Sequence, residues 1–181
     1  MFRLSLAIAT LVAACSFAQA QQRPYEGLQQ RSIKALSDQD QADLRAGRGM
    51  GFALAAELNG YPGPAHVLEL ADKLALIAEQ RAKVQALFDR MKAEAVPVGE
   101  SLVKLEADLD RQFALKTATE RSGADATAVI GTTQGVLRNV HLKFHLLTIE
   151  VLTPEQVRRY SELRGYTDTS QFTPHHRMHP R

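Results

Sequence analysis

Apolar residues recur every three or four positions along two long stretches of this chain. The first stretch covers residues 84–113 and the second covers residues 129–151. This spacing places a narrow apolar stripe along each of two helices, as in a coiled coil or a helical hairpin. A polar segment around Gly123 separates the two stripes. The sequence therefore predicts two long helices packed antiparallel across a short turn.

The two stripes predict which side chains face the core. The first stripe contains Val84, Leu87, Met91, Ala95, Val98, Leu102, Leu105, Leu109 and Phe113, and the second contains Val129, Thr133, Val136, Leu137, Val140, Phe144, Leu147 and Val151. Pro97 interrupts the first stripe, and an interior proline removes one backbone hydrogen bond and bends a helix. The stripe continues in phase beyond Pro97, so we expect one long bent helix. The second long helix is expected over residues 124–151.

Shorter helices are expected beside the hairpin. Ser37 is suited to cap a helix that ends at Gly47, and residues 50–58 fit a small apolar helix. Pro64, after the turn "YPGP", is suited to the first position of another helix. No stretch shows the alternation typical of a strand. The predicted fold class is all-α, a long bent antiparallel helical hairpin with short flanking helices.

The segment "LTPEQ" has the pattern of a helix start. It contains Leu152, Thr153, Pro154, Glu155 and Gln156. The threonine is suited to the N-cap, the proline to the first helical position, and the glutamine to the reciprocal bond of a capping box. The leucine is expected to pack onto the following turn. We therefore expect a corner here, where the second long helix ends and a last short helix begins in another direction.

A weaker copy of this corner occurs earlier, as "LALIAEQ" at residues 74–80. Leu76, Glu79 and Gln80 stand at the positions of the leucine, glutamate and glutamine of LTPEQ. Ile77 replaces the capping threonine and has no oxygen to accept a hydrogen bond. We therefore expect a softer bend or a continuous helix at this point.

The second long helix is apolar on its rear side as well. Leu142, Leu146 and Ile149 lie opposite the stripe, so residues 140–152 are apolar nearly all round. Such a helix must be covered on both sides. The small helix of residues 50–58 or a second copy of the protein would supply the second cover, and a homodimer is expected on this ground.

The first twenty residues have the pattern of a secretory signal. An arginine precedes an apolar run, and Ala-Gln-Ala at 18–20 suits cleavage after Ala20. The run is too short to cross a bilayer as a helix, so no transmembrane segment is expected after cleavage. The alternative is lipidation of Cys15, because "VAAC" also resembles a bacterial lipobox. Both interpretations place the protein outside the cytoplasm, in the periplasm.

Cleavage after Ala20 leaves a chain without cysteine that carries 21 basic and 20 acidic side chains. This excludes cysteine catalysis and thiolate metal sites, and the balanced charge gives no basic stripe for nucleic acid. No nucleophile elbow, phosphate loop or dinucleotide fingerprint is present, so we expect no enzyme. The expected organisation is a flexible lead-in (21–36), a helical-hairpin domain (37–166) and a disordered tail (167–181).

With its export signal, its hairpin pattern and LTPEQ with an imperfect second copy, the chain resembles the CpxP/Spy group, which is known for LTxxQ motifs. The resemblance covers roughly residues 60–166. It implies a bent helical hairpin that dimerises into a shallow cradle. It also implies a non-catalytic role in envelope stress, as a chaperone for unfolded proteins or an adaptor for envelope proteins. The alternative, from the related sensor members, is a heavy-metal sensor or metal-buffering protein.

Histidines supply the candidate metal ligands for that alternative. His141 and His145 are four residues apart, which places both side chains on one side of a helix. If the two halves are related as the duplicated motif suggests, His66 approaches this pair, with Glu69 or Glu57 as a carboxylate ligand. Such a set suits zinc, nickel, cobalt or copper. The competing interpretation is that these histidines pack beside the core through hydrogen bonds, and no cofactor is required for the fold.

Two further features bear on the metal hypothesis. Sensor members carry an early His-x-x-x-His pair, whereas only His66 stands in that region here. The tail "HHRMH" adds His175, His176, Met178 and His179, a set that suits weak scavenging of metal but no preorganised site.

Overall fold

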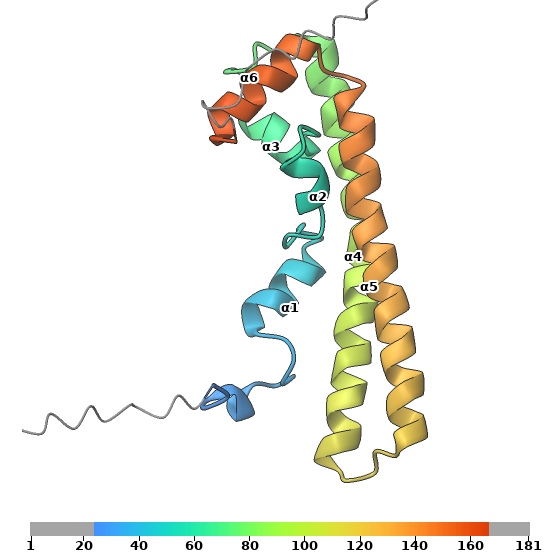
Figure 1. Cartoon of the computed structure of the whole chain (residues 1–181). Coiled ribbons are helices and arrows are strands. Elements are labelled where there is room, and N and C mark those ends of the chain that lie inside the picture. Colours follow the sequence, from blue (N-terminus) through green and yellow to red (C-terminus); the bar gives the residue numbers. More distant parts are fainter. Residues whose placement is uncertain (1–23, 167–181) are drawn as a thin grey trace, which may run out of the picture.

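The computed structural model describes residues 24–166, and over this range the protein is all-helical (Figure 1). In chain order the elements are a 3₁₀ turn at Leu28–Gln30, α1 (Asp38–Arg45), α2 (Leu54–Glu57), α3 (Pro64–Glu69), α4 (Ala78–Ala114), α5 (Glu120–Ile149) and α6 (Pro154–Arg164). The helices α4 and α5 form the predicted antiparallel hairpin. Within residues 24–166, no helix is both long and apolar enough to span a bilayer.

The long helix α4 continues through Pro97, as predicted. The start of α5 was predicted too late, because Gly123 lies inside the helix instead of ending the turn. Thr119 caps α5, because its hydroxyl accepts a hydrogen bond from the Ser122 backbone N–H, and the Ser122 hydroxyl accepts one from the Thr119 backbone N–H. This capping box sets the helix start. The turn before it includes Lys116, whose backbone is left-handed with φ of 58°.

The segment before α4 forms a third layer beside the hairpin. It runs from the hairpin tip towards the opposite end of the molecule, and α1, α2 and α3 lie along it (Figure 1). Helix α1 packs on α4, α2 packs on α5, and α3 packs on both long helices. Part of the segment predicted as a flexible lead-in, residues 21–36, is packed on the hairpin. Ile33 is buried within the core and makes an isolated backbone bridge with Leu36.

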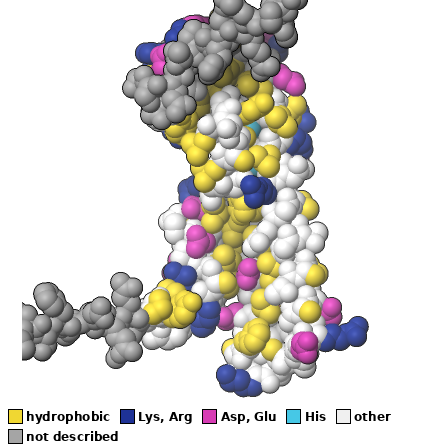
Figure 2. All heavy atoms as spheres, viewed as in Figure 1, with side chains coloured by type: hydrophobic (Ala, Val, Ile, Leu, Met, Phe, Trp, Pro, Cys, Tyr) yellow, Lys and Arg dark blue, Asp and Glu magenta, His cyan; other side chains and the backbone are white. Residues whose placement is uncertain are grey.

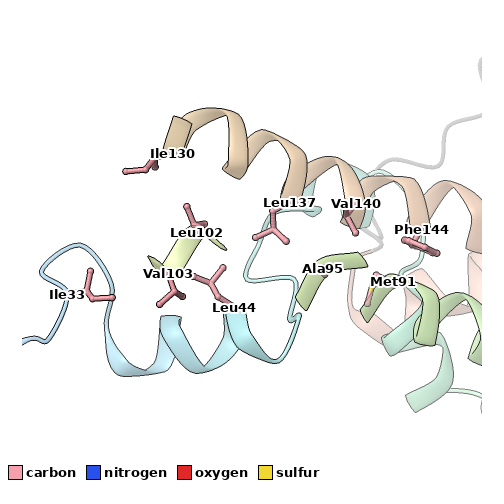
Figure 3. Close-up of a cluster of buried hydrophobic side chains, with 10 residues drawn as sticks. All are labelled: Ile33, Leu44, Met91, Ala95, Leu102, Val103, Ile130, Leu137, Val140 and Phe144. Carbon is pink, nitrogen blue, oxygen red and sulfur yellow. The ribbon is translucent and has the colours of Figure 1, made fainter. Parts of the chain in front are cut away.

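Side chains from α1, α4 and α5 meet in the main core (Figure 3). Its buried members are Ile33, Leu44, Met91, Ala95, Leu102, Val103, Ile130, Leu137, Val140 and Phe144. Most of the predicted stripe positions are therefore correct. Phe113, Val129 and Val136 are exceptions, with exposed fractions of 59%, 51% and 48%. Ile130 takes the inward place predicted for Val129, and Phe113 lies near the tip of α4.

Two short helices differ from their predicted bounds. The helix expected over residues 50–58 is reduced to α2, because Met50 and Gly51 adopt left-handed backbone conformations that a helix cannot contain. Pro64 starts α3 as predicted. However, α3 ends at Glu69, and Ala75 has a φ of 49°. The expectation of a soft bend or continuous helix at residues 74–80 is therefore wrong, since the chain breaks fully before α4.

The rear side of α5 is partly covered. Leu142 and Ile149 are half-buried, whereas Leu146 remains 54% exposed. His141 and His145 are buried on the side where α2 and α3 pack. The small helices therefore provide part of the second cover.

Gly99 allows α1 to approach α4 closely. A Cβ at this position would collide with the Leu44 carbonyl oxygen. We predict that Gly99→Ala lowers the free energy of unfolding by about 1–3 kcal/mol, because the backbone of α1 must move away. Gly131→Ala is the matched control, since its Cβ would enter open space, and it should raise stability by up to about 1 kcal/mol. Urea unfolding of both variants measures this difference, and equal effects would contradict the close approach.

Candidate functional site

The two motif corners meet at one end of the hairpin. The side-chain amides of Gln80 and Gln156 bond each other in both directions, at nitrogen–oxygen distances of 2.9 and 3.0 Å. Gln80 also donates to the Val151 carbonyl at 2.9 Å, and Gln156 donates to the Leu74 carbonyl at 3.2 Å. Each glutamine therefore ties its own corner to the other one.

The same two amides also start the helices that follow them. Gln156 accepts a hydrogen bond from the Thr153 backbone at 2.9 Å, and Thr153 accepts one from the Gln156 backbone, which completes the predicted capping box of α6. Gln80 accepts a hydrogen bond from the Ile77 backbone at 3.3 Å. Ile77 has no side-chain oxygen, so α4 has only half of a capping box. The glutamine therefore suffices for a sharp start where the threonine is missing.

Apolar packing supports these hydrogen bonds. Leu76 and Leu152 are both buried and belong to a second core cluster with Val67, Val84 and Tyr160. The remaining motif residues face solvent: Pro154 is at the first position of α6, Glu79 pairs with Lys83 at 2.7 Å, and Glu155 pairs with Arg158. Exposed pairs of this kind contribute little to stability. The core of the motif is therefore its leucine and glutamine.

Removal of one glutamine should loosen both corners. We predict that Gln156→Ala lowers the free energy of unfolding by about 1–3 kcal/mol, because the cap of α6 and the bond to Gln80 are lost together. Gln80→Ala in the same background should cost much less than alone, because the shared bond is already absent. The matched control is Gln134→Ala at an exposed position of α5, with an expected change within about 0.5 kcal/mol. Additive effects in urea unfolding would rule out the coupling.

A buried carboxylate lies beside the corners. Glu57, at the end of α2, accepts hydrogen bonds from the hydroxyl groups of Tyr160 and Tyr166, the latter at 3.1 Å. Arg164 Nε lies 3.6 Å from the same oxygen, Oε1. Glu57 therefore connects the N-terminal layer to α6 and to the residues that follow it.

Two histidines approach Glu57 from other elements. His66 Nδ1 on α3 lies 3.4 Å from Oε1, and His145 Nδ1 on α5 lies 3.7 Å from Oε2. His145 Nδ1 also lies 2.6 Å from the Tyr61 carbonyl oxygen, which accepts a hydrogen bond from it. A Cβ at Gly63 would collide with the His145 ring, so glycine is required there. Oε2 is buried and has no hydrogen-bond partner among the described residues.

The surroundings of Glu57 favour its ionised form. Burial alone would raise its pKa, but the contacts with His66 and Tyr160, together with the Tyr166 hydroxyl, lower the pKa to about 2. The pKa of Tyr160 is raised by burial and by the neighbouring carboxylate. Glu57 is therefore a permanent negative charge at neutral pH, held by donors from three elements.

His141 lies apart from this carboxylate cluster. Its ring stacks on Phe52, with a centroid distance of 6.2 Å and an angle of 7° between the ring planes. Burial, and then the nearby His145, lower the pKa of His141 to about 4, so the ring is neutral at pH 7. Nε2 is buried without a hydrogen-bond partner. This environment is that of a packing residue with one unused nitrogen.

The structure brings together only part of the predicted metal set. Within residues 24–166, no three His, Asp or Glu side chains are grouped closely enough to hold a metal. His66 and His145 share Glu57, whereas Glu69 lines an open hollow of about 370 Å³ beside His66. The predicted tail ligands, His175, His176, Met178 and His179, lie outside the described residues, as do the signal segment and Cys15.

Sequence reasoning missed the aromatic and basic partners of these groups. Tyr160, Tyr166 and Arg164 belong to a short polar helix and its end, where no periodicity marked them as buried. Tyr160 is nevertheless only 1% exposed. Comparison of the chain with protein-family models, curated proteins and solved structures finds no match.

The Glu57 cluster makes stability depend on pH. Because the folded pKa lies below 4.5, ionised Glu57 contributes stability that is fully present above pH 4.5 and is lost as pH falls towards 2. We predict that Tyr160→Phe lowers the free energy of unfolding by about 2 kcal/mol at pH 7, with a smaller loss at pH 3. Tyr25→Phe, at a tyrosine that is 78% exposed, is the control. The same loss at both pH values in urea unfolding would mean that packing alone, and not the carboxylate, is affected.

Proposed function

We propose that this protein is a periplasmic, non-catalytic binding protein of the CpxP/Spy type, which acts as an envelope-stress chaperone or adaptor. Its partners would be unfolded or envelope proteins. The paired corners support this proposal, because LTPEQ and its imperfect copy form one bonded unit through Gln80 and Gln156. Such pairing gives both copies of the duplicated motif one structural role.

The observation that carries the binding role is the exposed apolar surface at the hairpin tip. Phe113 and Leu115 are 59% and 65% exposed. At this end of the hairpin the third layer contributes only Ile33 and its neighbours to the core. A hollow of about 410 Å³ lies between the ends of α4 and α5, with Leu109 and Phe113 in its wall. Contiguous exposed apolar surface is the kind of surface at which interaction sites are found.

Charged groups are mixed with this apolar surface. Figure 2 shows hydrophobic side chains on one face of the molecule, with acidic and basic side chains scattered among them. A mixed surface of this kind suits weak binding of many unfolded segments, since no single shape is demanded. A second copy that covers Val136 and Leu146, which are 48% and 54% exposed, would form the proposed homodimer.

The chaperone role is tested with a denatured client. Residues 21–181 should slow the aggregation of reduced α-lactalbumin, followed by light scattering, when present in molar excess. Phe113→Ser combined with Leu115→Ser should remove most of this protection, because the apolar contact area at the tip is lost. The matched control is Leu54→Ser with Leu58→Ser on and beside α2, where both residues are equally exposed (54% and 56%).

Retained protection in the tip variant would show that the tip is not the binding surface. If the unmodified protein gives no protection, the chaperone role is wrong and only the adaptor role remains.

The second candidate function is a metal sensor or buffer. It is favoured by Glu57, an ionised carboxylate whose Oε2 has no hydrogen-bond partner among the described residues and which has His66 and His145 beside it. Coordination by His145 Nδ1 requires that its bond to Tyr61 be given up. Imidazole and carboxylate ligands suit zinc, nickel, cobalt or copper.

Calorimetric titration of residues 21–181 and 21–166 with these four metals separates a folded site from the tail. A folded site predicts that the shortened chain binds one equivalent, that Glu57→Gln abolishes this binding, and that Glu69→Gln preserves it. Binding by the longer chain alone would assign the metal to the tail histidines.

A further inference from the structure

Glu106 is a buried carboxylate that the fold does not use. It lies on α4 and is only 9% exposed. Within residues 24–166, no hydrogen bond or ion pair engages its side chain. Burial of a carboxylate without a partner destabilises a protein, and burial raises the pKa of Glu106. Stability therefore does not explain why an acid stands here.

The Glu106 side chain lines a hollow near the end of α4 at the hairpin tip. The hollow has a volume of about 300 Å³ and is lined by Lys34, Ala35, Glu106, Leu109, Asp110 and Phe113. These residues come from α4 and from the segment before α1, so neither α1 nor α5 places a charge in it. Its wall combines an aromatic ring, an aliphatic side chain and one unpaired carboxylate.

The other two charges of the hollow neutralise each other. Lys34 Nζ lies 3.5 Å from Asp110 Oδ2, and the Lys34 backbone donates to Asp110 Oδ1 at 3.3 Å. The hollow therefore has one uncompensated negative charge, that of Glu106. A cation is complementary to this negative charge, and a cation on an aliphatic stem also packs on the apolar wall.

We propose that this hollow binds a lysine or arginine side chain of an extended polypeptide segment. The aliphatic stem would pack on Leu109 and Phe113, and the cationic head would pair with Glu106. This inference rests on the proposed chaperone function and names the class of client segment. The binding of the cation supplies the partner that the buried carboxylate lacks.

The neighbouring hollow extends the site to a second client residue. Leu109 and Phe113 line both this hollow and the larger one between α4 and α5. The larger hollow has a mostly apolar lining, which includes Ala118 and Ala124. A segment that crosses the Phe113 ridge would place a basic residue on one side and an apolar residue on the other. The preferred segment therefore mixes basic and apolar residues.

Binding of labelled peptides by residues 21–181 tests the proposal. Fluorescence anisotropy is measured with a short peptide of alternating lysine and leucine and with a matched peptide of alternating glutamate and leucine. The lysine peptide should bind at least about tenfold more tightly, because only its charge is complementary to Glu106. Equal affinity for the two peptides would overturn the proposal.

Glu106→Gln identifies the carboxylate responsible. This nearly isosteric change should weaken binding of the lysine peptide by about tenfold, because one charge-assisted hydrogen bond is lost. Binding of the glutamate peptide should not become weaker. Asp108→Asn is the matched control, because it makes the same charge change on the same helix at an exposed carboxylate outside the hollow. Equal losses in both variants would show only a general effect of net charge. Thermal unfolding should show Glu106→Gln to be no less stable than the unmodified protein.

The pH dependence gives an independent readout. A cation prefers ionised Glu106, so affinity for the lysine peptide should fall as pH is lowered from 7 through the raised pKa of this residue. Glu106→Gln should abolish this fall, whereas Asp108→Asn should retain it. A fall of the same size in Glu106→Gln would assign the titration to another group and overturn the proposal.

Failure of the inference is distinguishable from failure of the chaperone function. If residues 21–181 protect reduced α-lactalbumin but show no preference for lysine peptides, the inference is wrong and the chaperone function stands. If lysine peptides bind through Glu106 but no client is protected, the hollow is correct and the chaperone function is wrong.

Discussion

The reciprocal bond between Gln80 and Gln156 is the interaction on which the arrangement of the other elements depends. Each amide starts one helix, bonds its counterpart and satisfies a carbonyl at the opposite corner. The hairpin alone would leave α3 and α6 free to take many directions. The amide pair fixes where α4 and α6 begin, and the leucines of both motifs, Leu76 and Leu152, are buried in the same apolar cluster. A fully satisfied, partly buried amide pair favours one geometry, because alternative arrangements leave polar groups without their partners.

Two buried glutamates show how differently one residue type is treated in this fold. Glu57 has two tyrosine hydroxyls, two histidines and an arginine around it, and its pKa falls to about 2. Glu106 has burial and no partner, and its pKa rises. The first carboxylate joins the N-terminal layer to the C-terminal helix. Among the described residues, Glu106 connects no elements. It lines a hollow at the tip end of α4 together with Leu109 and Phe113. The contrast supports a structural role for Glu57, or the proposed metal site, and the proposed ligand role for Glu106.

The third layer decides which parts of the hairpin are available for binding. Helices α1 to α3 pack along the long helices between Ile33 and the corners, and Gly99 permits the close approach of α1 to α4. Beyond Ile33 the two long helices continue to their turn, and Phe113 and Leu115 remain exposed there. The molecule therefore has a well-packed end, where both motifs lie, and an open end with apolar hollows. Proposed binding at the open end does not require the packed end to unfold.

By itself, the sequence determined the elements whose signals are local. The 3.6-residue period predicted both long helices, and the cap of Thr153 with Pro154 and Gln156 predicted the corner before α6, since each depends on residues within one or two turns. The sequence did not determine contacts between distant residues. The full break before α4 was missed because Ile77 lacks a cap, and the glutamine that replaces that cap is held by Gln156, 76 residues away. Likewise, the partners of Glu57 come from three helices, α3, α5 and α6, and from Tyr166 just after α6. Only tertiary packing decides that two tyrosines and two histidines surround this carboxylate while Glu106 has no such partners.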